Sequence, residues 1–595
     1  MQPRAWIRAG VLGGIVTIFL ALVGLIGNFT DLNIVGEDAI TFALLALLAA
    51  PFVAGYALTR PRIEAGERVE LTRSQTLLAG LVAGAVAGLV FGVVAVFADA
   101  FGVERIRQVF LNVTQDLIDF VTFGLPPVAG ALVLVVISAV AGFLGAGLRV
   151  LPEQVRKPVV TAAISVLALG FLQRIVPIAL DQLDLEREWL YNRSTGGLTW
   201  FGAGVVAAVA AALSVAKARR GAAIRAKLFP PPGAQEDEGV APLRFVVFAV
   251  LAGVLILLPW VVGEAISQVL GTALIYVLLG LGLNIVVGYA GLLDLGYVFF
   301  FAVGAYATAL LTGAMLNTFT GSGPPAISAD LSFYVAIPIV VVIAAAAGLL
   351  IGAPVLRLRG DYLALVTLGL GEMVTVLVRS PWLEPLVGGP NGMRGVTDAA
   401  IGGFGFRQPQ HFYYLVGAFV LLALFVSSRL STSRIGRAWT AMREDEQTAD
   451  AMGVSVTRFK LLAFAMGGAI GSLGGAMFAV QIGSLTPASF NVNVSILVLA
   501  IVILGGLGSL PGVVTGALVL VGLPGLLREF EEYRALAYGA AIVAVMILRP
   551  QGLVPNIRRS RELHDEEAAQ DEWAHAQEGE ESGAPATAGA GEVVT

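Results

Sequence analysis

Long apolar runs separated by short polar segments make up most of this chain of 595 residues. A helix rises 1.5 Å per residue, so about 20 apolar residues cross the roughly 30 Å of a bilayer core. The pattern predicts about 16 transmembrane helices. Six are expected near residues 9–27, 38–58, 75–98, 124–148, 158–180 and 198–216. Ten more are expected near 243–263, 266–288, 296–316, 332–356, 362–379, 411–428, 458–481, 493–509, 512–527 and 534–549.

Composition supports a membrane protein. The chain is 57% apolar and 13% charged, whereas soluble domains carry about 25% charged residues. Its 72 glycines suit helices that pack closely in lipid, where small residues let backbones approach. We therefore predict an all-α polytopic integral membrane protein, with a Gly/Ala-rich bundle in its C-terminal half.

Few residues are available for covalent chemistry. The chain has no cysteine, which excludes disulfides, thiolate metal sites and Cys nucleophiles. Only three histidines are present, His411, His564 and His575, and they offer little for a metal or catalytic cluster. We expect no enzyme activity, no catalytic residues, no metal and no cofactor.

Two polar segments divide the chain. Residues 217–243 combine a basic run, a proline triplet and an acidic run, a composition typical of an unfolded connector. The end of the chain is acidic and rich in Gly and Ala, which is typical of disorder. The predicted domains are a bundle of about six helices over 1–216, a cytoplasmic linker over 217–243, a bundle of about ten helices over 244–556 and a disordered tail over 557–595.

The distribution of Lys and Arg predicts orientation, because short loops rich in these residues stay in the cytoplasm. Counting from an inner N-terminus with Arg4 and Arg8, alternate loops are basic through to Arg549. We predict a cell-membrane protein with both termini cytoplasmic. The first run also fits a cleavable signal peptide, but its length and the lack of an A-x-A site after it favour a retained span.

Residues 103–120 place apolar side chains at helical spacing with charges between them. The pattern predicts one amphipathic helix. It lies either on the outer membrane surface or packed on the bundle as a solvated loop helix.

A charged segment lies between two apolar runs, 434-RIGRAWTAMREDEQTADAMGVSV-456. Its alanines favour helix, Arg443 to Glu446 supply charge, and Gly453 is a natural helix stop. A P-loop needs a Gly-Lys pair, and the chain contains none. An ATPase that drives transport must therefore be a separate polypeptide, and this segment is the predicted docking surface.

Several separated motifs carry a family resemblance. They are 284-NIVVGYAGLLDLGYVFFFAVGAYATALL-311, 357-RLRGDYLALVTLGLGEMVTVLVR-379, 388-GGPNGMRGV-396 and 505-GGLGSLPGVVTGALV-519. Together with the 434–453 loop, they resemble the permease family of branched-chain amino acid ABC importers, LivM-type, over about 245–555. The resemblance implies four kinds of partner: a second permease subunit of LivH type, two cytoplasmic ATPase subunits, an extracytoplasmic substrate-binding protein and the lipid bilayer, with no nucleic acid. It also implies a coupling role for Arg443, Glu444, Asp445, Glu446, Ala449, Met452 and Gly453.

Polar residues within the apolar segments are candidates for the translocation path or its gate, because ionisable groups are costly in lipid. The candidates are Asp294, Glu372 and Asn391. The alternative for the two carboxylates is structural, capping half-helices or satisfying backbone that glycine frees. The alternative for Asn391 is an ordinary tight turn.

The leading hypothesis is a permease subunit of an ATP-driven, binding-protein-dependent importer of branched-chain or related hydrophobic amino acids. One alternative is a urea or amide permease of the same family. Another is an ion-coupled secondary transporter, against which stands the scarcity of paired acids and bases in the spans. We expect the N-terminal bundle to be an accessory domain, with an elaborated N-terminus or a structural scaffold as the alternatives.

Overall fold

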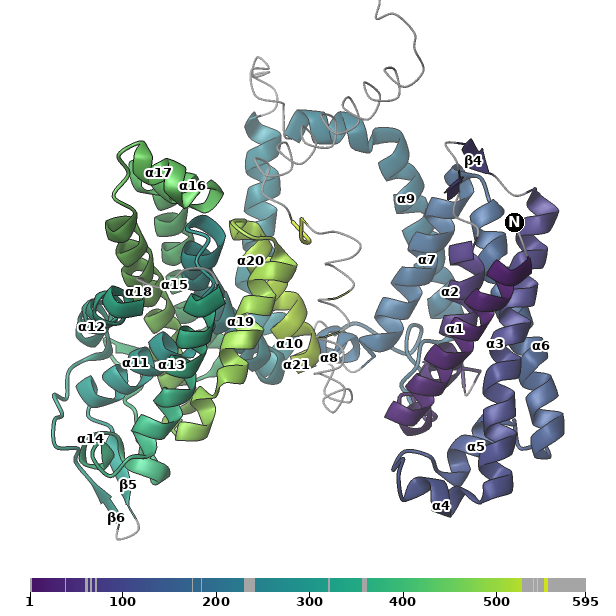
Figure 1. Cartoon of the computed structure of the whole chain (residues 1–595), viewed down its shortest axis with the longest axis horizontal. Coiled ribbons are helices and arrows are strands. Elements are labelled where there is room, and N and C mark those ends of the chain that lie inside the picture. The colour runs from purple at the N-terminus through teal and green to yellow at the C-terminus, as the bar shows by residue number, and fades with distance from the viewer. Residues whose placement is uncertain are drawn as a thin grey trace, which may run out of the picture. The chain divides into compact units, whose positions relative to one another are not determined.

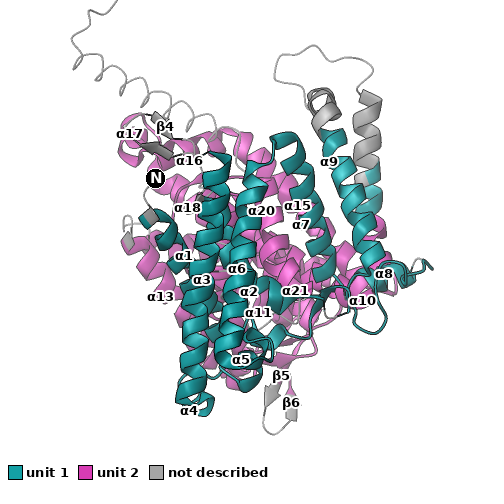
Figure 2. Ribbon diagram, turned by 90° about the vertical axis from the view of Figure 1, so that its right-hand side faces the viewer, with its two compact units in different colours: residues 1–255 teal, residues 256–595 magenta. Residues whose placement is uncertain are grey.

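The computed structural model describes residues 3–37, 39–58, 62–64, 67–69, 72–173, 175–182, 184–228, 241–318, 321–355, 361–526, 539, 543 and 551–554. The tail expected over 557–595, residues 229–240 of the linker expected over 217–243 and nearly all of the span expected over 534–549 lie outside these residues. The first part of that linker, 217–228, is helical as the end of α9 (Trp200–Leu228), where an unfolded connector was expected. The chain forms two compact units, residues 1–255 and 256–595 (Figure 1, Figure 2). Each unit is described by itself.

Unit 1 is a helical bundle in which short strands occur only in connections. Its two antiparallel hairpins pair β1 (Asn33–Val35) with β2 (Ile40–Thr41) and β3 (Arg62–Glu64) with β4 (Glu67–Val69). A one-turn 3-10 helix, η1 (Gly27–Phe29), precedes β1. The helices are α1 (Pro3–Val23), α2 (Phe42–Leu58), α3 (Arg73–Phe101), α4 (Val103–Arg107), α5 (Gln115–Val121), α6 (Pro127–Val150), α7 (Glu153–Phe171), α8 (Val176–Gln182) and α9 (Trp200–Leu228).

The helix expected over 103–120 is broken into α4 and α5. Residues 108–114 form turns between them, and the Thr114 hydroxyl accepts the Leu117 N–H at 3.2 Å to begin α5 afresh. An N-cap of this kind competes with continuation of a helix. The apolar spacing along 103–120 thus comes from two short helices.

Glycines bring α3 and α6 together. Gly80 and Gly84 lie on the buried face of α3, and a Cβ at Gly84 would collide with the carbonyl oxygen of Ser138 on α6. Backbones that approach this closely gain van der Waals contact. In lipid this contact drives helix association, because the hydrophobic effect does not act between helices there.

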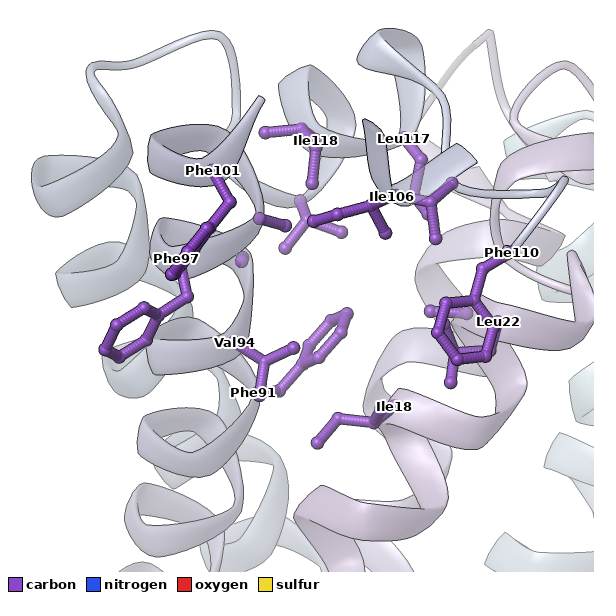
Figure 3. Close-up of a pocket in the computed structure, with 15 residues that line it drawn as sticks. Ile18, Leu22, Phe91, Val94, Phe97, Phe101, Ile106, Phe110, Leu117 and Ile118 are labelled. Carbon is purple, nitrogen blue, oxygen red and sulfur yellow. The ribbon is translucent and has the colours of Figure 1, made fainter. Parts of the chain in front are cut away.

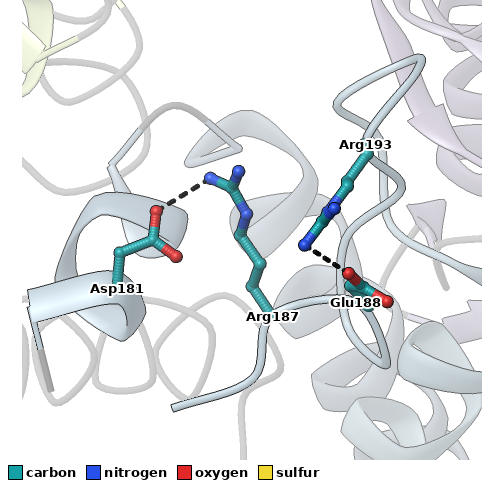
Figure 4. A network of polar contacts seen from close by, with 4 residues as sticks. All are labelled: Asp181, Arg187, Glu188 and Arg193. Atoms are coloured by element: carbon teal, nitrogen blue, oxygen red, sulfur yellow. Dashed lines mark hydrogen bonds and ion pairs between the residues drawn. The ribbon is translucent and has the colours of Figure 1, made fainter. Parts of the chain in front are cut away.

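The loop after α8 carries two exposed ion pairs, shown in Figure 4. Arg187 donates to Asp181 at 2.9 Å, and Arg193 pairs with Glu188. Exposed pairs of this kind contribute about 0–1 kcal/mol. Both arginines of this loop therefore have a nearby carboxylate as a counter-charge.

Unit 2 contains most or all of the two most deeply buried spans, Ala252–Tyr289 and Val456–Ile482. Helix α10 (Ala241–Leu283) begins in unit 1 and continues into unit 2. It joins the spans expected over 243–263 and 266–288 across a kink at Gly263, whose φ is +78°. The other helices are α11 (Val298–Leu311), α12 (Phe333–Val355), α13 (Asp361–Arg379), α14 (Glu384–Val387), α15 (Pro409–Thr432), α16 (Arg434–Glu444), α17 (Glu446–Ala451), α18 (Val456–Ile482), α19 (Val492–Gly505), α20 (Leu510–Ala517) and α21 (Leu523–Leu526). Two π-helical segments, η2 (Asn284–Tyr289) and η5 (Leu518–Gly522), and two 3-10 turns, η3 (Gly389–Asn391) and η4 (Pro487–Phe490), complete the set.

Helix α18 is the central helix of unit 2 and is almost wholly buried. Gly475 lies against the backbone of α11 at Phe301, and Gly304 of α11 lies against the backbone of α18 at Ser472. Tyr297 is fully buried, and its hydroxyl donates to the Gly467 carbonyl at 2.7 Å. Glycine contacts and one buried tyrosine thus fix α11 on α18.

A small antiparallel sheet closes one end of unit 2. Its strands are β5 (Met315–Thr318), β6 (Gly321–Gly323), β7 (Met393–Arg394) and β10 (Ser484–Leu485), in the order β10-β7-β5-β6. A separate hairpin pairs β8 (Ala400–Ile401) with β9 (Phe404–Gly405). Figure 1 shows β5 and β6 at one end of unit 2 and α16 and α17 at the other.

Ten helices of the described residues are long and apolar enough to cross a membrane, and four shorter apolar helices accompany them. One of the ten, Ala252–Tyr289, is 38 residues long and covers two of the expected spans. The prediction of an all-α polytopic membrane protein is confirmed.

A methyl group at the α11–α18 contact should destabilise the bundle. We expect Gly304→Ala to lower the stability of unit 2 by about 1–3 kcal/mol, because its Cβ meets backbone that cannot move aside. Thermal unfolding of the purified protein in detergent measures the loss. The matched control is Gly369→Ala on α13, where a Cβ meets open space and helix propensity predicts a gain of up to about 1 kcal/mol. Equal midpoints for the two variants would contradict the packing role.

Candidate coupling site and translocation segment

The charged segment at the end of unit 2 forms two consecutive helices, α16 and α17. The hydroxyl of Ser433 accepts the Gly436 N–H and begins α16. Asp445 ends α16 and begins α17, because its carboxylate accepts the Thr448 N–H at 2.7 Å. That hydrogen bond lowers the pKa of Asp445, so the cap stays ionised at neutral pH. At the end of α17, Gly453 adopts φ +87°, as a helix-terminating glycine does.

One face of this helix pair is anchored in the core. Trp439 is fully buried, and its indole N–H donates to the carbonyl of Phe459 on α18 at 2.8 Å. Met442 and Ala449 are buried in the same hydrophobic cluster. The pair therefore forms a packed layer on the end of α18.

A buried ion pair adds a second anchor. The ammonium of Lys460 lies 2.7 Å from the carboxylate of Glu446, with the lysine side chain 6% exposed and the glutamate side chain 37% exposed. A buried ammonium needs a partner, since removing one member of such a pair strands the other charge. Lys460 was missed by the sequence analysis. Its only signal is a lysine at the start of an apolar run.

Arg443 connects the helix pair to the broken helix of the bundle. Its guanidinium donates to the carbonyl of Gly288, in the π-helical segment η2. The side chain also packs over Gly291, which has φ +72° and where a Cβ would lie 2.5 Å from the arginine Cγ. A π-helical segment leaves carbonyls without their usual partners and often marks a functional position. Arg443 satisfies one of those carbonyls from outside the helix.

The other face of the helix pair is exposed. Met452 is 80% exposed, which is unusual for a large apolar side chain. The neighbouring exposed residues are polar or small: Glu444, Asp445, Gln447, Thr448, Asp450, Ala451 and Gly453.

The structure thus divides the seven residues of the predicted coupling set. Glu444, Asp445, Met452 and Gly453 lie on the exposed face. Arg443, Glu446 and Ala449 point toward the core, as anchors of that face.

Asp294 lies in the non-helical segment between η2 and α11 and is 2% exposed. Its carboxylate accepts the Gly296 N–H at 2.9 Å. The next N–H, that of Leu295, donates to the hydroxyl of Thr367 on α13 at 3.1 Å. Gly296 lies so close to the Thr367 carbonyl that a Cβ would collide with it. Asp294 thus caps a turn that is wedged against α13.

Asn284 ties the two glycine-rich breaks of the bundle together. The residue is fully buried, and its side-chain oxygen accepts the Gly508 N–H at 2.9 Å. Gly506 and Gly508, with φ +121° and +78°, form the break between α19 and α20. The buried Ser495 hydroxyl similarly accepts the Val298 N–H at 2.8 Å at the start of α11. Polar side chains therefore satisfy backbone that the broken helices leave unpaired, as lipid requires.

Glu372 and Asn391 lie on different elements from Asp294. Glu372 is exposed on α13, the helix whose Thr367 and Gly371 lie against the turn at 295–296, and its carboxylate has no hydrogen bond or ion pair with another described residue. Asn391 ends the 3-10 turn η3 beside the β7 strand, so it belongs to the sheet end of unit 2. The three candidates for the translocation path thus lie on three separate segments of unit 2.

Within the described residues, no group of three or more His, Asp or Glu side chains is placed to hold a metal ion. The site consists of an anchored helix pair, a connecting arginine and a set of broken helices. An all-α membrane bundle of this kind has the architecture of a transport permease.

Comparison with known proteins identifies the family. The family described as "Branched-chain amino acid transport system / permease component" matches residues 265–548. The LivM permease protein of the high-affinity branched-chain amino acid transport system is 40% identical in Salmonella typhimurium, over 52% of this chain and 75% of the relative. The Escherichia coli LivM protein is 41% identical, over 51% and 73%. The LivH permease protein of Salmonella typhimurium is 29% identical over 24% of this chain and 46% of the relative.

The chain belongs to the branched-chain amino acid ABC transport permease family and is of LivM type. No solved structure matches it. Residues before 265 lie outside the family match, whereas α16 and α17, the broken helices and the small sheet all fall within the family region.

Removing the partner of Lys460 should loosen the helix pair. We expect Glu446→Gln to lower stability by about 1–3 kcal/mol, because it leaves a buried ammonium without its counter-charge. Limited proteolysis at 434–456 and thermal unfolding measure the effect. Glu444→Gln, an exposed neighbour, is the matched control and should change stability by less than about 0.5 kcal/mol. If the control is equally damaging, the ion pair is not an anchor.

Proposed function

We propose that this chain is a permease subunit of an ATP-driven, binding-protein-dependent importer of branched-chain or related hydrophobic amino acids. Its proposed partners are a second permease subunit of LivH type, two cytoplasmic ATPase subunits and an extracytoplasmic substrate-binding protein. The observation that carries the proposal is the α16–α17 pair, which is anchored by Trp439 and Lys460 on one face and polar on the other. A chain without a P-loop needs such a surface so that a separate ATPase can dock on it and transmit its movement.

The contacts suggest how movement would pass from the ATPase to the path. A force on the exposed face reaches α18 through Trp439 and Lys460, and it reaches η2 through Arg443. Packed elements move as units because close-packed interiors do not deform continuously. The broken segments around Asp294 and Asn284 are the proposed moving parts, and alternating access is the proposed transport cycle.

The position of Glu372 indicates that the exposed face of α13 is a surface for the second permease subunit. The exposed face of α13 is apolar apart from this carboxylate and includes Tyr362, Leu365, Met373 and Val376. Glu372 is seven residues from the end of α13 at Arg379, or about 10 Å along the axis. A carboxylate at that depth is too costly to face lipid. We propose that this face meets the second permease and borders the translocation path.

The proposed orientation places both termini and the α16–α17 pair in the cytoplasm of a cell-membrane protein. The basic loops support it, as does the separation of α16 and α17 from the small sheet in Figure 1. The sheet end, with Asn391, would then face the binding protein and form the outer gate. The N-terminal bundle over 1–216 is proposed as an accessory domain, joined by the linker 217–243 to the permease domain 244–556.

Charge and shape changes on the exposed face should abolish coupling without unfolding the protein. We expect the double variant Glu444→Lys/Met452→Asp to lower recovery of the ATPase subunits by at least about tenfold, because interface hot spots of this kind contribute 1.4 kcal/mol or more. Co-purification from membranes and substrate-stimulated ATP hydrolysis are the measurements.

The control for this test is Asp31→Lys, an exposed charge reversal in unit 1, which should leave ATPase recovery unchanged. Normal assembly and stimulated hydrolysis in the double variant would overturn the coupling assignment. Uptake by the purified chain alone, driven by an ion gradient, would replace the whole proposal with a secondary transporter.

Replacing the carboxylate of Glu372 on α13 should weaken pairing with the second permease subunit without lowering the stability of the chain. We expect Glu372→Leu to leave the isolated chain as stable as the parent or more so, because a costly charge is gone. Recovery of the second permease subunit and amino acid uptake should both fall. Val376→Leu keeps the apolar character of the same face and should preserve both. Unchanged pairing and uptake in Glu372→Leu would show that this face meets neither the partner nor the path.

A further inference from the structure

Unit 1 contains an apolar cavity of about 320 Å³ between the end of α1 and the end of α3. Figure 3 shows Ile18 and Leu22 on one side and Phe91 and Val94 on the other, with the turns and short helices of 102–121 above them. All fifteen lining residues are Ala, Val, Leu, Ile or Phe. No polar side chain enters the space.

Specific contacts build this cavity. The side-chain amide of Asn112 donates to the carbonyl of Leu22 at 3.1 Å and to that of Val23 at 2.8 Å. These bonds hold the segment between α4 and α5 over the end of α1. The break in the amphipathic segment then lets Val113 and Leu117 turn inward as buried residues.

The size and chemistry of the cavity select its occupant. An apolar cavity of about 150 Å³ stays dry and binds benzene, so about 320 Å³ has room for roughly twice that amount of hydrocarbon. The open side carries three exposed phenylalanines. Phe97 and Phe101 lie on α3, which is long and apolar enough to span a membrane, and Phe110 lies in the turns after α4. The hydrocarbon that such a surface meets is the bilayer itself.

Charged residues of both signs lie next to lining residues in the sequence. Asp99 follows Ala98, and Glu104, Arg105 and Arg107 flank Ile106; all four are exposed, so this segment favours no headgroup charge. We propose that this cavity is a lipid-binding site that holds one acyl chain of a membrane phospholipid, recognised by its hydrocarbon and not by its headgroup. The site lies outside the family match and does not depend on the proposed transport function.

Photolabelling of the full chain tests the proposal. The protein is placed in nanodiscs with a trace of phospholipid that carries a diazirine in its acyl chain, and the labelled peptides are mapped by mass spectrometry. We expect the peptides over 18–22 and 91–101 to be labelled more strongly than the lipid-exposed surface of α6 at Leu132 and Val136. Phosphatidylethanolamine and phosphatidylglycerol probes should label these peptides equally.

Filling the cavity should remove the signal. Ala98 lines the space and is buried, so we expect Ala98→Phe to lower labelling about tenfold, the effect of losing burial of about two methylenes. Leu89→Phe, an equally bulky residue on an exposed position of α3, is the control and should label as the parent does. If Ala98→Phe does not yield folded protein, Ala21→Phe fills the cavity from α1 and takes its place.

The following results would overturn the proposed site. Labelling of 91–101 that only equals that of α6, or that survives both filling variants, means contact with bulk lipid alone. A signal restricted to one headgroup would overturn recognition through the hydrocarbon. Protection of the same peptides by a co-purifying protein, without lipid labelling, would make the cavity a protein interface instead.

Discussion

The permease unit depends on one constraint: backbone N–H and C=O groups inside a membrane bundle must be satisfied within the protein. The helices of this unit break at 290–297 and at 506–509. Side chains must therefore satisfy the backbone groups that these breaks leave unpaired. Asn284, Ser495 and Thr367 accept freed N–H groups, while Arg443 donates to a freed carbonyl. Polar residues that look isolated in an apolar sequence thus hold the broken helices in place through hydrogen bonds to their backbone.

Close glycine contacts and buried polar anchors meet on α18. At the centre of the bundle its glycines admit the backbone of α11, and at its end Lys460 and the Phe459 carbonyl receive the charged helix pair. Helix α18 therefore packs at the centre of the bundle and also holds the proposed docking surface at its end. A rigid helix with both connections can transmit displacement over its length, since its backbone hydrogen bonds leave little freedom to bend.

The N-terminal unit follows the same packing chemistry without the family match. Its α3 and α6 meet through glycines, as α11 and α18 do. Its apolar cavity lies between α1 and α3, two helices that are long and apolar enough to span a membrane. The lipid site that we propose there lies outside the family match.

The sequence by itself determined the membrane class, the position of nearly every described span and the helical, charged character of 434–453 with its stop at Gly453. The split of this segment into α16 and α17 at Asp445 was not predicted. These features follow from local period and composition, which each stretch of chain carries alone. Only the tertiary structure decided which way that segment faces. Arg443, Glu446 and Ala449 turn inward because their partners, or the core they pack in, lie up to 155 residues away in sequence. It also decided that 103–120 breaks in two and encloses a cavity. The second helix begins at the local Thr114 cap, but the cavity forms because Asn112 bonds to Leu22 and Val23, 90 and 89 residues earlier in the chain. A local pattern carries the cap, whereas contacts between distant segments depend on the whole fold.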